Sequence, residues 1–168
     1  METYQQSSPE LSFNNKVLKS ILLAGFVAGT LDLLSAFTVY CVFGPSTVEK
    51  LLQYIASGLY GADAFRGGTA MALAGTFFHY VFAFSWAFIY YIFTLYIPFA
   101  RNNFVISGLI YGFFVWLFMN FVVVPNSSIA QPSTAPTFIS RFISLSCILL
   151  FIGLPIAFII SRYYKRRS

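Results

Sequence analysis

Two ionisable side chains stand alone inside long apolar segments of this sequence, and they are the residues most able to do chemistry. Asp32 lies in an apolar run over residues 17–43, and His79 lies in a second run over residues 68–97. A carboxylate and an imidazole can hydrogen-bond to each other, and they can also exchange a proton or contact a solute. The first question is therefore where the chain places them.

Their positions along the two runs favour a direct pairing. At about 1.5 Å per residue of helix, Asp32 lies roughly 22 Å from the start of its run and His79 roughly 17 Å from the start of the other. If the runs are antiparallel helices of about 40 Å, both side chains lie slightly outside the middle. We predict that Asp32 faces the protein interior and pairs with His79, with Asn120 or Arg66 as alternative partners.

The pair has two interpretations that the sequence leaves open. A hydrogen-bonded pair would lock the two helices together, whereas a reactive pair would handle a proton or a solute. Burial favours the neutral form of each group, while their mutual attraction favours the charged forms. The protonation states of Asp32 and His79 are therefore not fixed by the sequence.

Composition identifies the solvent in which this chain folds. Of its 168 residues, 58% are hydrophobic and 9% are charged, and the mean hydropathy is +0.77. A soluble domain usually has about 25% charged residues, and a short soluble chain leaves much of its surface exposed. Lipid is the natural solvent for such a sequence. The net charge of +5 does not indicate nucleic-acid binding, because the basic residues flank apolar segments.

The apolar segments predict an all-α membrane protein with four transmembrane helices. A membrane helix needs about 20 mostly apolar residues. The four segments that qualify are residues 17–43, 68–97, 104–124 and 138–161. They form a single transmembrane domain over residues 16–162, preceded by a polar tail at 1–15 and followed by a basic tail at 163–168.

The basic residues predict that both termini are cytoplasmic. Seven of them fall on one side of a four-span arrangement and three on the other. The seven are Lys16, Lys19, Arg101, Arg162, Lys165, Arg166 and Arg167, and the three are Lys50, Arg66 and Arg141. Lysine and arginine are enriched in cytoplasmic loops. The C-terminal sequence "RYYKRRS" could also bind anionic lipid headgroups.

The first outer connection predicts a short amphipathic helix over residues 46–60. Ser46 and Glu49 have the spacing of a capping box, and Gly58 and Gly61 would end the helix. The apolar side chains at helical spacing are Val48, Leu51, Leu52, Ile55 and Leu59. Gln53 and Ser57 fall mostly on the opposite face, and Asp63 would cap the next helix. The segment is too short to span a bilayer, so we expect it at the interface, either as a structural cover or as a lid for a substrate.

Glycine spacing predicts close helix packing. Gly25 and Gly29, like Gly108 and Gly112, are separated by three residues, which permits close approach of two backbones. Packing within one chain is the favoured use, and homo-oligomerisation is the alternative. Pro155 should kink the last helix, because proline has no backbone N–H to donate.

The sequence has no enzyme motif, so we expect no catalytic activity and no cofactor. It lacks a phosphate-binding glycine loop, a nucleophile elbow and a cluster of zinc ligands, and a single histidine cannot build a multi-histidine metal site. Cys41 and Cys147 fall at different predicted depths, so we expect no disulfide.

Several blocks resemble a widespread family of small bacterial inner-membrane proteins of unassigned function. The blocks are "AGTLDLLSAF", "LLQYIASGLYGADAFRGG", "FFHYVFAFSWAFIYY", "GLIYGFFVWLFMNFVVVP" and "GLPIAF". The family is in turn distantly similar to YagU-like proteins. The resemblance implies four membrane helices in a bacterial inner membrane and no particular reaction. Family members often carry a second histidine shortly before the "GLP", which this chain lacks. We therefore expect a structural or accessory membrane protein, or alternatively a small transporter or channel that uses Asp32 and His79.

Overall fold

The computed structural model describes residues 15–42, 44, 46–129 and 136–165, and these residues contain no strand. Four helices are long and apolar enough to cross a membrane. They are Asn15–Val42, Gly68–Tyr96, Phe104–Val123 and Phe138–Tyr163. Each boundary lies within two residues of the predicted one, so hydropathy alone located the four helices. The predicted tail at 1–15 lies outside the described residues, apart from Asn15, which begins the first helix.

The chain forms the following elements in order. They are α1 (Asn15–Phe37), η1 (Thr38–Val42), α2 (Val48–Tyr60), η2 (Gly61–Arg66), α3 (Gly68–Tyr96), α4 (Pro98–Asn102), α5 (Phe104–Phe118), η3 (Met119–Val123), α6 (Phe138–Cys147), η4 (Ile148–Gly153) and α7 (Leu154–Lys165). The segments η1, η3 and η4 are π-helical turns that continue α1, α5 and α6, whereas η2 is a 3₁₀ helix.

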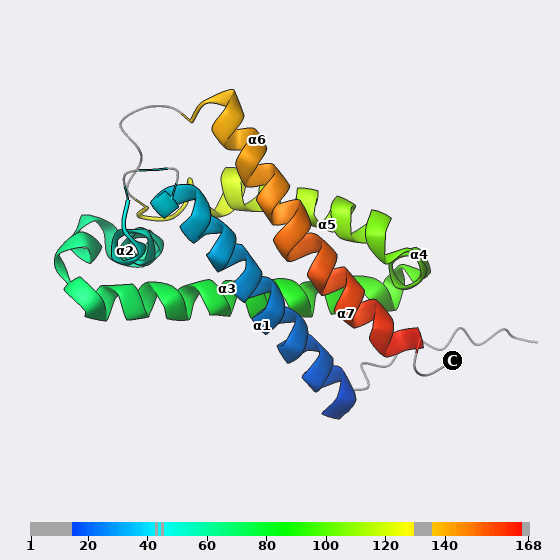
Figure 1. Cartoon of the computed structure of the whole chain (residues 1–168). Coiled ribbons are helices and arrows are strands. Elements are labelled where there is room, and N and C mark those ends of the chain that lie inside the picture. Colours follow the sequence, from blue (N-terminus) through cyan, green and yellow to red (C-terminus); the bar gives the residue numbers. More distant parts are fainter. Residues whose placement is uncertain (1–14, 43, 45, 130–135, 166–168) are drawn as a thin grey trace, which may run out of the picture.

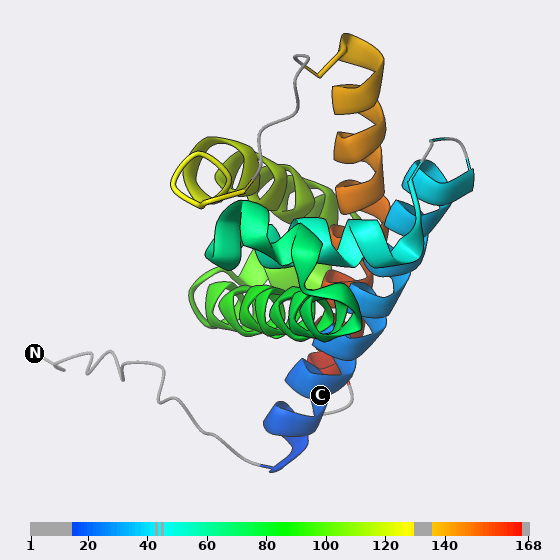
Figure 2. The same ribbon diagram turned by 90° about the vertical axis from the view of Figure 1, so that its left-hand side faces the viewer.

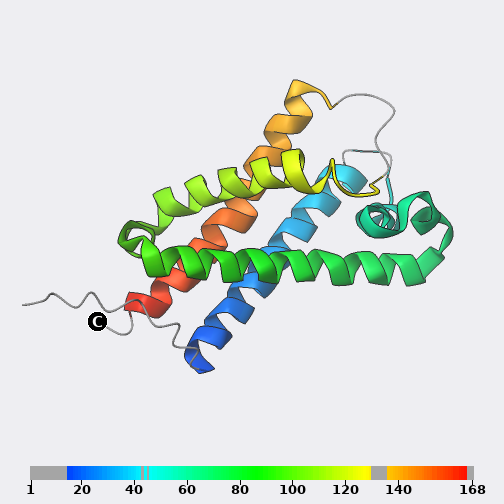
Figure 3. The same cartoon turned by 180° about the vertical axis from the view of Figure 1, so that it is seen from behind.

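The long helices form two layers. One layer contains α1 and the span made of α6, η4 and α7, which run in opposite directions; the other contains α3 and α5 (Figures 1 and 2). The chain enters α1 and leaves α7 at the same end of the bundle, where α4 also lies (Figure 3). The helix α2 and the turn η3, which ends the third span, lie at the other end (Figure 3). This alternation of direction is what four successive spans require.

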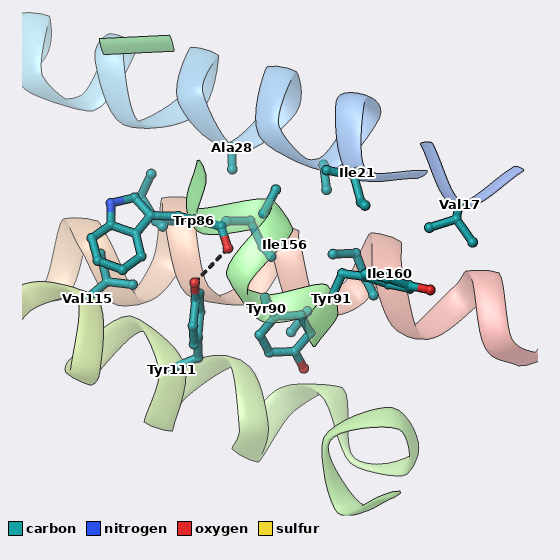
Figure 4. Packing of buried hydrophobic residues seen from close by; sticks show 14 residues of the cluster. Val17, Ile21, Ala28, Trp86, Tyr90, Tyr91, Tyr111, Val115, Ile156 and Ile160 are labelled. Atoms are coloured by element: carbon teal, nitrogen blue, oxygen red, sulfur yellow. Dashed lines mark hydrogen bonds between the residues drawn. The ribbon is translucent and has the colours of Figure 1, made fainter. Parts of the chain in front are cut away.

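Large rings fill the space between α3 and α5. Tyr90 is 1% exposed, and the ring centroids of Tyr90 and Tyr111 are 4.9 Å apart (Figure 4). The hydroxyl of Tyr111 donates a hydrogen bond of 2.6 Å to the backbone carbonyl of Trp86, so α3 and α5 meet through rings. On the other side, Ala24 and Ala28 are fully buried and bring α1 close to α7. Rings on one side and small residues on the other thus set the helix spacing.

Glycine pairs bring helix backbones together within the chain, as predicted. A Cβ atom at Gly25 would lie 2.9 Å from the Cα of Phe84 on α3. A Cβ atom at Gly112 would lie 3.0 Å from the Cα of Leu149 on η4, and one at Gly153 would overlap the carbonyl oxygen of Gly108. Both predicted glycine pairs are therefore used for contacts inside one molecule.

The kink predicted at Pro155 stays a prediction, and what the structure shows just before this residue is a change in helix type. The π-helical turn η4 ends at Gly153, two residues before Pro155, and the span continues through α7 (Figure 1). Because proline cannot donate to the carbonyl one turn earlier, the regular ladder is interrupted in this stretch. The free thiols Cys41 and Cys147 form no disulfide, as expected from their depths.

The helix predicted at residues 46–60 exists, but several of its details differ from the prediction. Its N-cap is Thr47, whose hydroxyl accepts from the N–H of Lys50, and not Ser46. Gly58 lies inside α2, and Gly61 with a φ of +60° ends it. Asp63 does not cap α3, whose N-cap is Gly67. Ser46 lies outside the helix and donates its backbone N–H to the carbonyl of Tyr40 in η1, at 3.2 Å.

The buried face of α2 also differs from the predicted apolar stripe. Gln53 is 5% exposed and Ser57 is fully buried, although both were assigned to the polar side, whereas Leu59 is 64% exposed. Gln53 donates through Nε2 to the backbone carbonyl of Gly68, a distance of 3.1 Å. The reason is that α2 packs against α3 at Gly75, where a Cβ atom would lie 2.8 Å from the carbonyl carbon of Leu52. Close backbone contact attaches this helix together with Leu51, which is 6% exposed, so the apolar stripe is buried only in part.

Candidate functional site

The polar site predicted around Asp32 lies where α1 and α3 touch. Gly29 faces α3 closely, since a Cβ atom there would lie 2.8 Å from the Cβ of Ala83 and 3.2 Å from the ring of Tyr80. The absence of a side chain at Gly29 brings the α3 residues His79 and Tyr80 against the backbone of α1. Asp32 follows Gly29 by three residues, which places it on the same side of the helix.

The imidazole of His79 bonds to the main chain of α1. Its Nε2 lies 2.8 Å from the carbonyl oxygen of Gly29. Because a carbonyl oxygen only accepts, Nε2 carries the proton in this contact. The imidazole ring meets the ring of Tyr80 edge to face, with the two ring centroids 5.6 Å apart. The histidine ties α1 to α3 without using the carboxylate.

Asp32 lies near His79 but is not bonded to it. The carboxylate is half-buried and close enough to His79 for the two groups to interact electrostatically. It makes no hydrogen bond or ion pair with any residue in the described part of the chain, and only its backbone carbonyl accepts, from Ser35 Oγ at 2.8 Å. The direct Asp32–His79 bond that we predicted is therefore not formed, because the imidazole N–H goes to Gly29.

A second polar bridge between the same helices was not predicted. The hydroxyl oxygens of Thr30 and Tyr80 lie 2.9 Å apart, and Thr30 also donates to the carbonyl of Phe26 at 2.8 Å. Since Thr30 has one proton and uses it on Phe26, Tyr80 donates to Thr30. The ring of Tyr80 stacks on that of Phe26 at 5.9 Å. The two bridges join consecutive residues, Gly29 and Thr30 on α1 and His79 and Tyr80 on α3. The only signal in the sequence is that each of these pairs is consecutive.

The two alternative partners lie elsewhere. Asn120 is exposed and donates through Nδ2 to the carbonyl of Trp116 in its own helix, at 2.8 Å. The guanidinium of Arg66 lies 3.8 Å from the carboxylate of Asp63, and both side chains are more than four-fifths exposed. Each of the two side chains has a partner three or four residues away in the sequence, so neither is brought to Asp32.

A group of buried hydroxyls surrounds α4 at the end of the bundle where the described chain begins and ends. The sequence analysis did not predict it. The backbone carbonyl of Ala100 in α4 accepts from Tyr90 at 3.0 Å, from Ser107 at 3.3 Å and from Ser161 at 3.3 Å. These donors come from α3, α5 and α7. The hydroxyls of Tyr90 and Ser107 are also 2.8 Å apart. One carbonyl thus joins three spans to the short helix between two of them.

The chemistry available to the site at the α1–α3 contact is limited to proton exchange and polar contact. The carboxylate of Asp32 and the Nδ1 of His79 are the two groups there without a hydrogen bond to the described chain. Within the described residues, no three His, Cys, Asp or Glu side chains gather in a group that could hold a metal ion. The residues that offer a contact to a proton or a solute are therefore Asp32 and His79.

The chain was compared with protein-family models, with curated proteins and with solved structures. None of the three comparisons finds a match. The family resemblance carried by the sequence blocks therefore stays a prediction.

Proposed function

We propose that this chain is a multi-pass protein of the bacterial inner membrane with a structural or accessory role. Four helices long and apolar enough to cross a membrane support the multi-pass arrangement. The proposal includes no enzymatic reaction. The resemblance of the sequence blocks to small bacterial inner-membrane proteins supports the choice of membrane.

The distribution of charge supports an orientation with both termini in the cytoplasm. Lys16, Lys19, Arg101 and Arg162 belong to α1, α4 and α7 at the end of the bundle where the described chain begins and ends (Figures 1 and 3). Basic residues are enriched on the cytoplasmic side of membrane proteins. With this orientation, α2 lies at the outer end and crosswise to α1 and α3, which suits a helix at the outer interface (Figure 1).

The observation that carries the accessory role is how the polar groups between the helices are used. Tyr111, Tyr90, Ser107 and Ser161 donate to backbone carbonyls of neighbouring elements. Tyr80 donates to Thr30 across the α1–α3 contact. These bonds hold helices together, and large rings occupy the space between α3 and α5. Such an interior is built for packing, which suits a protein that supports or accompanies a partner in the bilayer.

A second candidate function, transport of a proton or a small solute, is favoured by Asp32. Its carboxylate lies in the span α1 and has no bonded partner in the described chain. A charged side chain at the centre of a membrane helix costs ~3 kcal/mol on insertion scales, so its retention there calls for a reason. Asp32 is not needed to hold α1 against α3, because His79 and Thr30 already join the two helices.

A flux assay in liposomes separates the two functions. We would reconstitute the wild-type chain, Asp32→Asn and the control Asp63→Asn, whose side chain is 86% exposed on η2, and follow an imposed proton gradient with a pH-sensitive dye. The accessory role predicts the slow leak of empty liposomes for all three proteins. Proton flux in the wild type and in Asp63→Asn that Asp32→Asn abolishes, with normal folding, would overturn the accessory role in favour of transport.

A further inference from the structure

A small pocket lies at the end of the bundle where the described chain begins and ends. Its volume is about 230 Å³, and it is lined by Phe104, Phe158, Ser161 and Arg162. Phe104 opens α5, and the other three belong to the last turns of α7. Pockets that enclose a drug-sized molecule measure about 300–1,000 Å³. This pocket is smaller, so it fits a part of a molecule that lies along the surface of the bundle.

The walls of the pocket are apolar and held in place. The rings of Phe104 and Phe158 meet edge to face, with centroids 5.3 Å apart. Ser161 is 2% exposed and directs its hydroxyl away to the carbonyl of Ala100, so it adds little polarity to the wall. Packed rings of this kind are a suitable surface for a hydrocarbon chain.

Arg162 supplies a positive charge at the rim of the pocket. Its guanidinium carbon lies 4.9 Å from the centroid of the Phe158 ring, which fixes the side chain over the aromatic wall. It forms no ion pair with a carboxylate of the described chain. The edge of a guanidinium stacked on a ring still presents N–H donors with the geometry that binds a phosphate.

Within the described residues, the charged side chains at this end of the bundle are basic. Lys16, Lys19 and Arg101 belong to elements at this end of the bundle, α1 and α4. The carboxylates of the described chain are placed elsewhere: Asp32 lies within α1, and Glu49 and Asp63 lie on α2 and η2 at the other end. A ligand that suits this end therefore carries negative charge beside an apolar segment.

We propose that this pocket binds one anionic phospholipid, with its phosphate on Arg162 and the first part of an acyl chain along Phe104 and Phe158. The small volume suits a chain segment and the rings suit hydrocarbon. The guanidinium, which pairs with no carboxylate in the described part of the chain, suits the phosphate. The site requires only that this end of the bundle meets a bilayer, whichever role the protein has.

Native mass spectrometry of the full chain in detergent tests this site. We would titrate phosphatidylglycerol or phosphatidylcholine and determine the dissociation constant of the first bound lipid for the wild type, Arg162→Gln, Arg162→Lys and the control Arg141→Gln. Arg141 is an exposed arginine on α6, at the other end of the bundle. A basic residue near a lipid headgroup contributes about fivefold in affinity.

The expected result is preferential binding of phosphatidylglycerol that weakens about fivefold in Arg162→Gln, less in Arg162→Lys, and not in Arg141→Gln. Competition by glycerol phosphate at the lipid's own concentration would show that the acyl chain contributes nothing and would overturn the proposal. Equal binding of the two lipids by the wild type would also overturn it, and this comparison needs no variant. Equal weakening by Arg162→Gln and Arg141→Gln would reduce the effect to overall charge and contradict a defined site.

Discussion

The contact between Gly153 and α5 predicts a large effect for the smallest possible substitution. A methyl group at Gly153→Ala would overlap the carbonyl oxygen of Gly108 and lie 2.9 Å from the Cα and 3.0 Å from the N of Gly112. All three atoms are backbone atoms of α5, so no side-chain rotation can relieve the overlap. Overpacking costs about 1–3 kcal/mol, and rigid neighbours place this site at the upper end.

The helical preference of alanine offsets part of that cost. Alanine is favoured over glycine in a helix by about 1 kcal/mol, so we expect Gly153→Ala to lower the free energy of unfolding by about 2 kcal/mol. Gly58 is the matched control, since it lies inside α2 and the nearest atom to its Cβ would be Ser127 Cβ at 3.9 Å. Gly58→Ala should stabilise the protein by up to ~1 kcal/mol.

Reversible unfolding in mixed micelles, with increasing dodecyl sulfate and far-UV circular dichroism as the readout, measures both variants. The predicted difference between them is about 3 kcal/mol. Equal stability of Gly153→Ala and Gly58→Ala would refute the close packing of η4 on α5 and, with it, the role assigned to Gly153 in the last span.

Two further predictions concern buried polar groups and use the same unfolding assay. Gln53→Ala should destabilise the protein by about 1–2 kcal/mol, because it leaves the Gly68 carbonyl without its side-chain donor, whereas Leu59→Ala should change stability by less than about 0.5 kcal/mol; the reverse order would restore the apolar stripe as the attachment of α2. Tyr90→Phe and Ser161→Ala remove two donors to one carbonyl, so a double-mutant cycle should show a coupling of at least ~0.5 kcal/mol, and strict additivity would contradict the shared acceptor.

The long helices could be predicted from sequence because lipid imposes a simple rule. A span needs a run of apolar residues of fixed length, and the runs that end near Val42, Tyr96, Val123 and Tyr163 satisfy it. The glycine pairs were predictable for a similar reason, since a residue without a side chain in an apolar helix marks a close contact. Both signals depend on residue type alone.

The polar contacts could not be predicted because they depend on register between helices. Two groups within one turn of α1, the carbonyl of Gly29 and the carboxylate of Asp32, could accept from the N–H of His79. Which of them does so depends on how far α1 and α3 are shifted along each other. Gln53 was assigned to the polar face because periodicity treats every polar side chain as exposed, yet a backbone carbonyl of α3 was within its reach. Hydroxyls around Ala100 likewise come from three spans, and no local pattern connects them.

The measurement that tests the account most directly is the membrane sidedness of the two ends of α3. We would replace Cys41 and Cys147 by alanine, introduce Asp63→Cys on η2 or Asn102→Cys at the end of α4, both exposed positions, and label intact cells with a membrane-impermeant maleimide. Four spans with cytoplasmic termini predict that Asp63→Cys is labelled in intact cells and that Asn102→Cys is labelled only after permeabilisation. The opposite pattern would reverse the orientation, and equal labelling of both positions in intact cells would contradict a membrane-spanning α3.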